Sequence, residues 1–296
     1  MLCTRSRSRF LIGFVLPLFA LAACGGGSSS SSSGGGPTED SSAAGMVPQA
    51  VKAKGTLTVG ADATYAPMEF IASDGKTVIG VDADLAHAIG LVLGLKLDMT
   101  NATFDTIIPG IQSGKYDLGI SSFTDTKDRE KVLDFVTYFT AGTSFFVKAS
   151  GGPNIKQLSD LCGHKVSVET GTTEQTDAQQ QASTCASQGK PALTVDTYPD
   201  QNSANLALSS GRDDVGMADS PVAAYQVQQS KGQLKLSGPS YGNGPYGIAI
   251  PKSNGMTKPI LQAVKDLMAD GTYTQILNKW GVQLGAITNP AINAGS

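Results

Sequence analysis

A run of glycine and serine near the N-terminus decides where this chain can fold. Residues 25–36 read GGGSSSSSSGGG, and this sequence predicts a flexible coil because it offers no side chains to pack. We expect a flexible tether over residues 24–54, so any globular fold must be built from the residues after it. About 240 residues remain there, enough for one large hydrophobic core or two modest ones.

The residues before the tether are typical of an export signal. Arg5, Arg7 and Arg9 precede the apolar run 10–20, and small residues then lead to Cys24, which is the order found in signal peptides. The apolar run is too short to span a bilayer. Residues 1–23 are therefore predicted to be a signal peptide.

The end of this signal resembles the lipobox of bacterial lipoproteins, which implies that Cys24 is lipidated and becomes the mature N-terminus. An ordinary signal peptide with an incidental cysteine is the alternative. Anchors of this kind carry more than one acyl chain, and they hold a protein stably on a membrane that it does not cross. We expect an extracytoplasmic protein anchored to the bacterial cell membrane by an N-terminal lipid.

The charge balance argues against one class of partner. The chain has 22 lysines and arginines and 25 aspartates and glutamates, so removing three arginines with the signal leaves 19 basic residues and a formal charge of −6. Nucleic acid is therefore not an expected partner.

Two of the four cysteines lie in the folded part of the chain, because one belongs to the predicted signal peptide and Cys24 would carry the lipid. Cys162 and Cys185 form an even pair in an oxidising compartment, which favours a disulfide. A metal site is the weaker alternative, because neither His164 nor any other residue completes a set of ligands. We expect no metal and no cofactor.

Patterns of strands and helices alternate after the tether. Residues 57–60 alternate like a strand, and residues 84–93 place their apolar side chains on one helical face. Further strands are predicted at residues 96–99 and 118–120, and further helices at 105–113 and 127–131. This alternation indicates an α/β fold with mostly parallel sheets and helices on both faces.

A second series of the same kind predicts a second lobe. Strands are expected at residues 165–168, 193–198 and 215–218, and helices after Gly171 and at 202–209. After this series come a strand at residues 246–250, a helix at 260–268 and a last helix that ends near Trp280. Extended crossings at residues 142–148 and 241–247 would join the lobes as a two-segment hinge. Ligands bind at the carboxyl ends of such sheets, so we expect a cleft between the lobes.

Five strings in the folded part are recognisable when they occur in this order. They are LTVGADATYAPMEF from Leu57, GVDADLAHAIG from Gly80, FDTIIPGIQSGKYD from Phe104, SSFTDTKDREKVLDFVTYF from Ser121 and DGTYTQILNKWG from Asp270. They resemble the polar amino-acid-binding proteins of ABC importers, extracytoplasmic solute-binding proteins of family 3, over residues 55–287. Val81 departs from the aromatic residue common at its position, which we interpret as a packing difference.

The resemblance implies a two-lobed type II periplasmic-binding-protein-like fold. Lobe 1 would comprise residues 55–143 and 245–287, lobe 2 residues 144–244, and residues 288–296 would be a tail. It also implies an extracytoplasmic receptor that delivers its ligand to the membrane permease of an ABC importer with a cytoplasmic ATPase. We expect the receptor to be a monomer.

The resemblance assigns the ligand's α-carboxylate to Arg129, whose planar fork can pair with it bidentately. Thr124 and the backbone around Ser122 would lie near that carboxylate, and Thr173, at a predicted helix N-terminus, would complete the anion site from the second lobe. A solvated surface position for Arg129 is the alternative.

The resemblance assigns the ligand's α-ammonium group to Asp219. As an isolated residue before Ser220 and Pro221, Asp219 would instead be expected to cap a helix. Tyr65 and Phe104 match aromatic positions that sandwich the ligand side chain. Without the family pattern, both aromatic residues would be interpreted as core.

Selectivity for the ligand side chain is expected from Asp62 and Glu169. Two further carboxylates in a desolvated cleft would be unpaired against a neutral ligand, so we predict a cationic amino acid such as lysine, arginine or ornithine. If either carboxylate points to solvent or bonds to the backbone, glutamine, histidine or another polar amino acid becomes the alternative. Glu69 could contribute, but the sequence does not place it.

The sequence gives little support for an enzyme. His87 and His164 lie in unrelated surroundings, and no Gly-x-Ser-x-Gly string occurs, so we predict a receptor and no enzyme. Dehydratases and lytic enzymes nevertheless use the same architecture, and Glu169 would be the candidate acid or base of such an enzyme. A receptor that presents its ligand to a membrane sensor is a further alternative.

Overall fold

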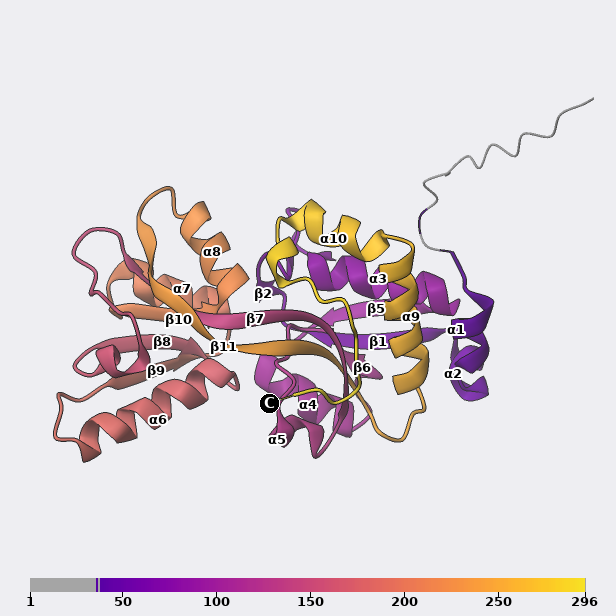
Figure 1. Cartoon of the computed structure of the whole chain (residues 1–296), viewed down its shortest axis with the longest axis horizontal. Coiled ribbons are helices and arrows are strands. Elements are labelled where there is room, and N and C mark those ends of the chain that lie inside the picture. Colours follow the sequence, from indigo (N-terminus) through magenta and orange to yellow (C-terminus); the bar gives the residue numbers. More distant parts are fainter. Residues whose placement is uncertain (1–35, 37, 296) are drawn as a thin grey trace, which may run out of the picture. The chain divides into compact units, whose positions relative to one another are not determined.

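Eight strands form one sheet in the order β5-β1-β6-β11-β7-β10-β8-β9 (Figure 1). The computed structural model describes residue 36 and residues 38–295. The predicted signal peptide and the predicted lipidation site Cys24 lie outside the described residues. The strands of the sheet are β1 (Thr56–Ala61), β5 (Lys96–Asn101), β6 (Leu118–Gly119), β7 (Asp134–Lys148), β8 (Lys165–Glu169), β9 (Thr194–Tyr198), β10 (Val215–Asp219) and β11 (Leu234–Ile250).

The two long strands β7 and β11 join the two halves of the sheet. In one half β1 pairs in parallel with β5 and β6, and in the other β8 pairs in parallel with β9 and β10. Strands β7 and β11 lie antiparallel in the middle, with Ile250 opposite Asp134 at one end and Leu234 opposite Lys148 at the other. We expected two separate sheets, which is wrong, because the extended crossings are themselves strands and hydrogen-bond to each other.

A smaller three-stranded sheet lies in the first half of the chain. Its strands β2 (Thr64–Tyr65), β3 (Glu69–Ile71) and β4 (Val78–Ile79) are all antiparallel. The sequence pattern does not reveal this sheet, because its strands are only two or three residues long.

The helices agree with the predicted α/β alternation. They are α1 (Ser41–Met46), α2 (Gln49–Lys54), α3 (Val81–Leu93), α4 (Phe104–Gln112), α5 (Lys127–Glu130), α6 (Thr173–Ser187), α7 (Gln201–Ser210), α8 (Ser220–Gln229), α9 (Thr257–Ala269) and α10 (Thr272–Trp280), with short 3-10 turns η1 (Leu158–Leu161) and η2 (Gln283–Gly285). Gly94 and Gly281 end α3 and α10 in the left-handed conformation that glycine adopts without strain.

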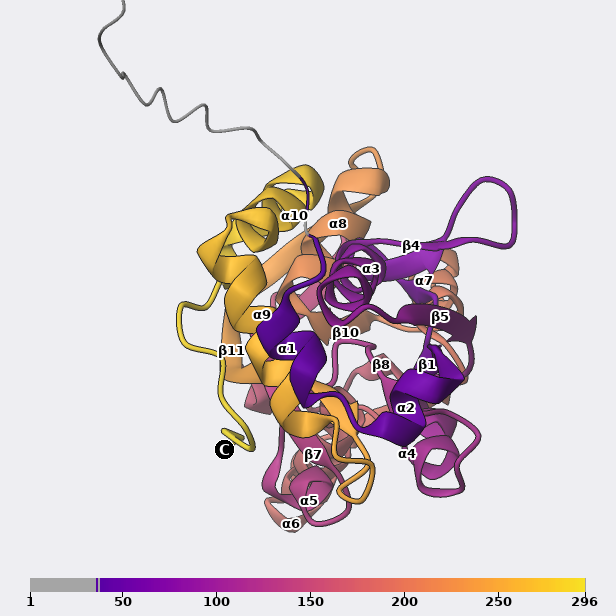
Figure 2. The same cartoon turned by 90° about the vertical axis from the view of Figure 1, so that its right-hand side faces the viewer.

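One large hydrophobic core fills the first half and extends to α8 of the second, and each half also has a smaller core of its own. In the first half α3 and α9 cover one face of the sheet through residues such as Ile89 and Ile260, while α4 covers the other through Ile107 (Figure 2). In the second half Val166 and Val168 pack with residues of α6. Two packed halves around shared long strands are the two-lobed architecture that was expected.

The C-terminal part of the predicted tether, beyond residue 40, is wrong. Helices α1 and α2 occupy residues 41–46 and 49–54, and Ala43 and Val47 are buried in the core with α9. Asp40 begins α1 by accepting hydrogen bonds from the backbone N–H groups of Ser42 and Ala43. These small apolar residues after a capping aspartate fold because they find a surface of α3 and α9 to cover.

The predicted tail also belongs to the fold as far as it is described. Ala291 and Asn293 exchange backbone hydrogen bonds with β7, and Asn293 Oδ1 accepts a further bond from the Phe135 N–H at 2.8 Å. The polar side chain of Asn293 thus replaces a strand partner at the open edge of β7.

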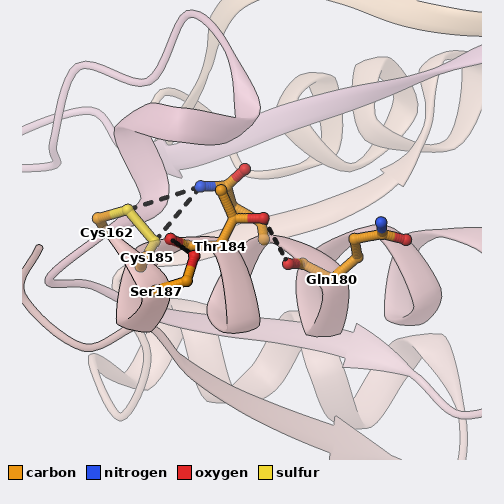
Figure 3. Close-up of a disulfide and its surroundings, with 6 residues drawn as sticks. Cys162, Gln180, Thr184, Cys185 and Ser187 are labelled. Carbon is orange, nitrogen blue, oxygen red and sulfur yellow. Dashed lines mark hydrogen bonds between the residues drawn. A yellow bond between two sulfur atoms is a disulfide. The ribbon is translucent and has the colours of Figure 1, made fainter. Parts of the chain in front are cut away.

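Cys162 and Cys185 form the expected disulfide, with their Cα atoms 5.7 Å apart (Figure 3). The bond joins the end of η1 to the last turn of α6. This pairing excludes the alternative of a metal site at these cysteines.

None of the helices in the described part of the chain is long and apolar enough to cross a membrane.

Candidate ligand-binding site

One cavity brings together all nine predicted ligand-binding residues. It lies where the two halves of the sheet meet. The nine predicted residues are Asp62, Tyr65, Phe104, Ser122, Thr124, Arg129, Glu169, Thr173 and Asp219. Glu69, Ser121, Thr172 and Glu174 also line it.

The parallel strands explain why these residues meet. Asp62 follows β1, and Ser121 follows β6 by two residues. Glu169 and Asp219 are the last residues of β8 and β10. The carboxyl ends of parallel strands from both halves therefore face the same space, as expected for a ligand site in an open α/β sheet.

Arg129 is held in place by the protein backbone. It lies on the short helix α5, and its guanidinium donates hydrogen bonds to the carbonyl of Thr124 at 2.8 Å and to that of Gly171 at 3.1 Å. Its Cζ lies 5.3 Å from the centre of the Phe104 ring, and Phe104 in turn stacks on Phe123. This position is inconsistent with a solvated surface arginine.

The N-terminus of α6 faces Arg129 across the cavity. Thr172 caps this helix by accepting a hydrogen bond from the Gln175 N–H at 3.1 Å, and Thr173 is its first residue. The following residue, Glu174, was not predicted as part of the site. It is buried and accepts a hydrogen bond from the Thr143 hydroxyl at 2.6 Å.

Asp219 points into the cavity and does not cap a helix. It precedes α8, but its side chain accepts no hydrogen bond from that helix. It accepts instead from the Tyr65 hydroxyl at 3.1 Å, and that hydroxyl accepts from the Asp219 N–H at 3.0 Å. Burial raises the pKa of Asp219 well above its ordinary value, and the nearby charge of Glu174 raises it further.

Asp62 and Glu169 lie together inside the cavity. Their side chains are 3% and 2% exposed, and the charge of Asp62 acts on Glu169. Asp62 also accepts from the Thr64 hydroxyl and from the Phe104 N–H, whereas Glu169 Oε1 has no hydrogen-bond partner in the described structure. Burial raises the pKa of Asp62, and burial followed by the charge of Asp62 raises that of Glu169 well above its ordinary value.

Glu69, which the sequence could not place, lies in the same cavity on β3. It is 1% exposed and accepts hydrogen bonds from the hydroxyls of Ser121 and Ser122. The only signal for it in the sequence is a single acidic residue inside the otherwise apolar string that follows Tyr65.

Hydrogen bonds cross the cavity from one half of the protein to the other. Tyr65 of the first half bonds to Asp219 of the second, and Arg129 of the first bonds to Gly171 of the second. A third bond joins the Gln201 N–H to the Thr64 hydroxyl at 3.1 Å. The structure therefore shows the two halves in contact around the site.

Sequence comparison identifies the family. The profile of the bacterial extracellular solute-binding proteins, family 3, matches residues 57–283. The chain belongs to this family. It is therefore a solute-binding protein that acts outside the cytoplasm, and its fold is the type II periplasmic binding fold of related solved structures.

Individual relatives have known ligands. The arginine-binding protein ArgT of Corynebacterium glutamicum is 34% identical over 84% of this chain and 81% of its own length. An ancestral arginine-binding protein is similar in structure, with 38% identity, a TM-score of 0.71 and coverage of 76% of this chain and 98% of that one. The same ancestral type has also been solved bound to glutamine.

A third solved structure connects the fold to catalysis. It is the ancestral amino acid-binding protein AncCDT-1, a precursor of cyclohexadienyl dehydratase, which is 34% identical with a TM-score of 0.67 and covers 78% of this chain and 97% of its own.

Proposed function

We propose that this solute-binding protein captures a cationic amino acid, with arginine preferred, and delivers it to the permease of an ABC importer. The observation that carries the proposal is the buried pair Asp62 and Glu169, which faces a cavity in which Arg129 is the one cationic lining residue among those described. The arginine-binding relatives support the same ligand class.

The charges of the cavity favour a ligand with a positive side chain. Arg129 and Asp219 match the carboxylate and the ammonium group of any amino acid. Asp62 and Glu169 are then left facing the ligand side chain. Burying two carboxylates without a cation costs several kcal/mol. A ligand with a guanidinium or ammonium group on its side chain therefore binds more tightly than one with a neutral side chain.

Glutamine is the second candidate, because Asp62 accepts a hydrogen bond from the backbone N–H of Phe104, which is the case in which a neutral polar ligand was expected. Burial raises the pKa of both Asp62 and Glu169, and a carboxyl pair that keeps a proton can both donate to and accept from a side-chain amide. The glutamine-bound ancestral relative supports this alternative. Histidine would be accommodated for similar reasons.

The test is calorimetric titration of the protein after unfolding and refolding have removed any ligand carried through purification. Arginine, lysine, ornithine, citrulline, glutamine and histidine would be compared. The comparison of arginine with citrulline is the most informative, because citrulline has the shape of arginine without its charge. We expect arginine to bind at least about 100-fold more tightly than citrulline, since that ratio corresponds to about 2.7 kcal/mol.

Variants assign this preference to the carboxyl pair. Glu169→Gln should reduce the arginine-to-citrulline ratio, whereas the matched control Glu39→Gln, at an exposed position, should leave it unchanged. Equal or tighter binding of citrulline or glutamine by the unaltered protein would reject a cationic ligand and leave an amino-acid receptor.

We also propose that the protein has no catalytic activity, acts as a monomer, and is anchored by lipid on Cys24. Mass spectrometry of bound arginine after long incubation should recover it unchanged, and turnover would reassign the site to an enzyme with Glu169 as acid or base.

Release of the protein from membranes by Cys24→Ala would support the anchor, and retention would contradict it. Co-purification with a permease and an ATPase, in place of a membrane sensor, would support delivery.

A further inference from the structure

Residues 291–295 form a C-terminal strap that follows β7 and ends against α5 (Figure 1). Asn293 fixes its course, because its side chain accepts a hydrogen bond from the Phe135 N–H at 2.8 Å and donates one to Asp134 Oδ1 at 3.1 Å. The strap lies beyond residue 283, where the match to the family profile ends.

The end of the strap is tied to two carboxyl groups. The Ala294 N–H donates to Asp125 Oδ2 at 2.9 Å, and the Gly295 N–H donates to Glu130 Oε1 at 2.9 Å. Hydrogen bonds from a backbone N–H to a carboxylate are charge-assisted and stronger than neutral ones. The approach is also close, because a Cβ at Gly295 would lie 2.3 Å from the Asp125 carbonyl oxygen.

The two carboxyl groups flank the turn that carries Arg129. Helix α5 (Lys127–Glu130) is about one turn long, and a helix this short does not hold its shape without contacts to the rest of the fold. Asp125 precedes the turn and Glu130 ends it. Arg129 lies between them, and its guanidinium donates to the Thr124 carbonyl at 2.8 Å. By holding both ends of the turn, the strap fixes the place from which the guanidinium reaches the cavity.

The strap also offsets the repulsion between these two carboxyl groups. Burial, and after it the charge of Glu130, raises the pKa of Asp125 to about 6, whereas the hydrogen bond from the Ala294 N–H acts to lower it. Lys127 Nζ balances part of the charge, because it lies 3.1 Å from Glu130 Oε1. Without the donors of the strap, two like charges would stand beside the turn and favour its opening.

We propose that the C-terminal strap is a positioning element for ligand recognition, which holds α5 so that Arg129 meets the ligand's carboxylate in one fixed place. This inference rests on the proposed function, because it takes the carboxylate of an amino acid as the partner of Arg129. None of the strap residues lines the cavity, so the strap acts through Arg129 and not on the ligand itself.

Gly295→Ala tests the contact where it is tightest. The added Cβ meets the Asp125 carbonyl, so the end of the strap must move away from α5. Gly45→Ala is the matched control, because a Cβ at Gly45 meets nothing within 4 Å. Asn293→Gly releases the strap in a second way. Glycine accepts the φ of 53° at this position without strain but lacks the side chain that bonds to β7.

Binding of arginine would be compared with binding of agmatine, which is arginine without its carboxylate. We expect each strap variant to lose about 10-fold in arginine affinity, about 1.4 kcal/mol. Agmatine affinity should change less than about twofold, because agmatine has no carboxylate for Arg129 to hold. In the ligand-free variants, hydrogen exchange should become faster in the peptide that contains α5 and stay unchanged in α6.

The outcomes separate this inference from the proposed function. Equal losses for arginine and agmatine, or an unchanged arginine affinity in both strap variants, would overturn the inference. If agmatine binds too weakly for calorimetry, hydrogen exchange decides. Faster exchange confined to α5, together with the loss of arginine affinity, supports the strap, whereas faster exchange in α5 and α6 alike shows a general loss of stability and contradicts it. Failure of the unaltered protein to bind arginine would instead reject the proposed function.

Discussion

Arg129 is preorganised at the residue scale, because two backbone carbonyls and an aromatic ring fix its guanidinium. Lysine cannot reproduce the planar fork or both of these hydrogen bonds. We expect Arg129→Lys to weaken arginine binding by about 100-fold or more, since a bidentate charge-assisted contact is replaced by a point charge. Calorimetry would measure this, with the exposed Lys131→Arg as a control. Retention of affinity within about threefold would show that Arg129 does not hold the carboxylate.

Single buried carboxyl groups also make the stability of the fold depend on pH. Burial raises the pKa of Glu169, so the folded protein keeps a proton that the unfolded chain has lost. The stability from this group is fully present below its unfolded pKa, near about 4.3, and is lost as pH rises through the folded pKa. We expect the unfolding free energy of the unaltered protein, minus that of Glu169→Gln, to fall between about pH 4.5 and about pH 7.5.

Ligand binding should respond to pH in the opposite direction. A cationic side chain needs a charged carboxylate, so binding of arginine must displace the proton. The rise in melting temperature caused by arginine should therefore be larger at about pH 7.5 than at about pH 5. Thermal melts with and without arginine measure both effects, and a pH-independent rise would argue against charged carboxylates at the ligand.

At the scale of elements, α6 serves two purposes at its two ends. Its N-terminus faces Arg129 in the cavity, while its last turn carries Cys185 and the disulfide (Figure 3). The cysteines are 23 residues apart, and closing a loop of this size stabilises a fold by about 3 kcal/mol. We expect Cys162→Ser with Cys185→Ser to lose about that much in unfolding free energy.

Arginine affinity should change little in the same double variant, because the disulfide lies at the far end of α6. Denaturant melts and calorimetry together make the check. A large loss of affinity with unchanged stability would mean that the disulfide positions the site.

The whole molecule has two halves that share only the long strands β7 and β11 in its sheet. Their pairing shifts register between Ser237 and Tyr241 and again before Gly244, and Gly142 has no room for a side chain there because a Cβ would lie 2.6 Å from the Tyr241 carbonyl. We propose that this stretch is the hinge between lobe 1, residues 55–143 and 245–287, and lobe 2, residues 144–244. Closure over the ligand would then follow from a small rotation here.

Small-angle scattering tests the hinge. The radius of gyration should decrease when arginine is added, because the ligand binds the closed form more tightly. Tyr65→Phe removes a hydrogen bond across the cavity and should shift the free protein toward the open form, with Tyr225→Phe outside the cavity as a control. An unchanged radius on addition of a ligand that calorimetry shows to bind would reject closure.

Much of the fold could be predicted because it follows from the spacing of apolar residues that are close in the sequence. The spacing of apolar residues predicted α3, α4, α7, α9 and the strands of both parallel series. The family resemblance, and not the periodicity, singled out Arg129 and Asp219. The short strands β2 to β4 and the helices α1 and α2 were missed, because segments of so few residues fold only against a surface that the rest of the chain provides.

The sequence by itself determined the α/β alternation, the pairing of the two remaining cysteines and the chemical types available to the site, since these depend on neighbouring residues and on their counts. Only the tertiary structure decided that Glu69, Ser121 and Glu174 also line the cavity and that one sheet runs through both halves. The physical reason is distance along the chain. Residues such as Tyr65 and Asp219 lie 154 positions apart, and they meet only because the carboxyl ends of strands from both halves face one space.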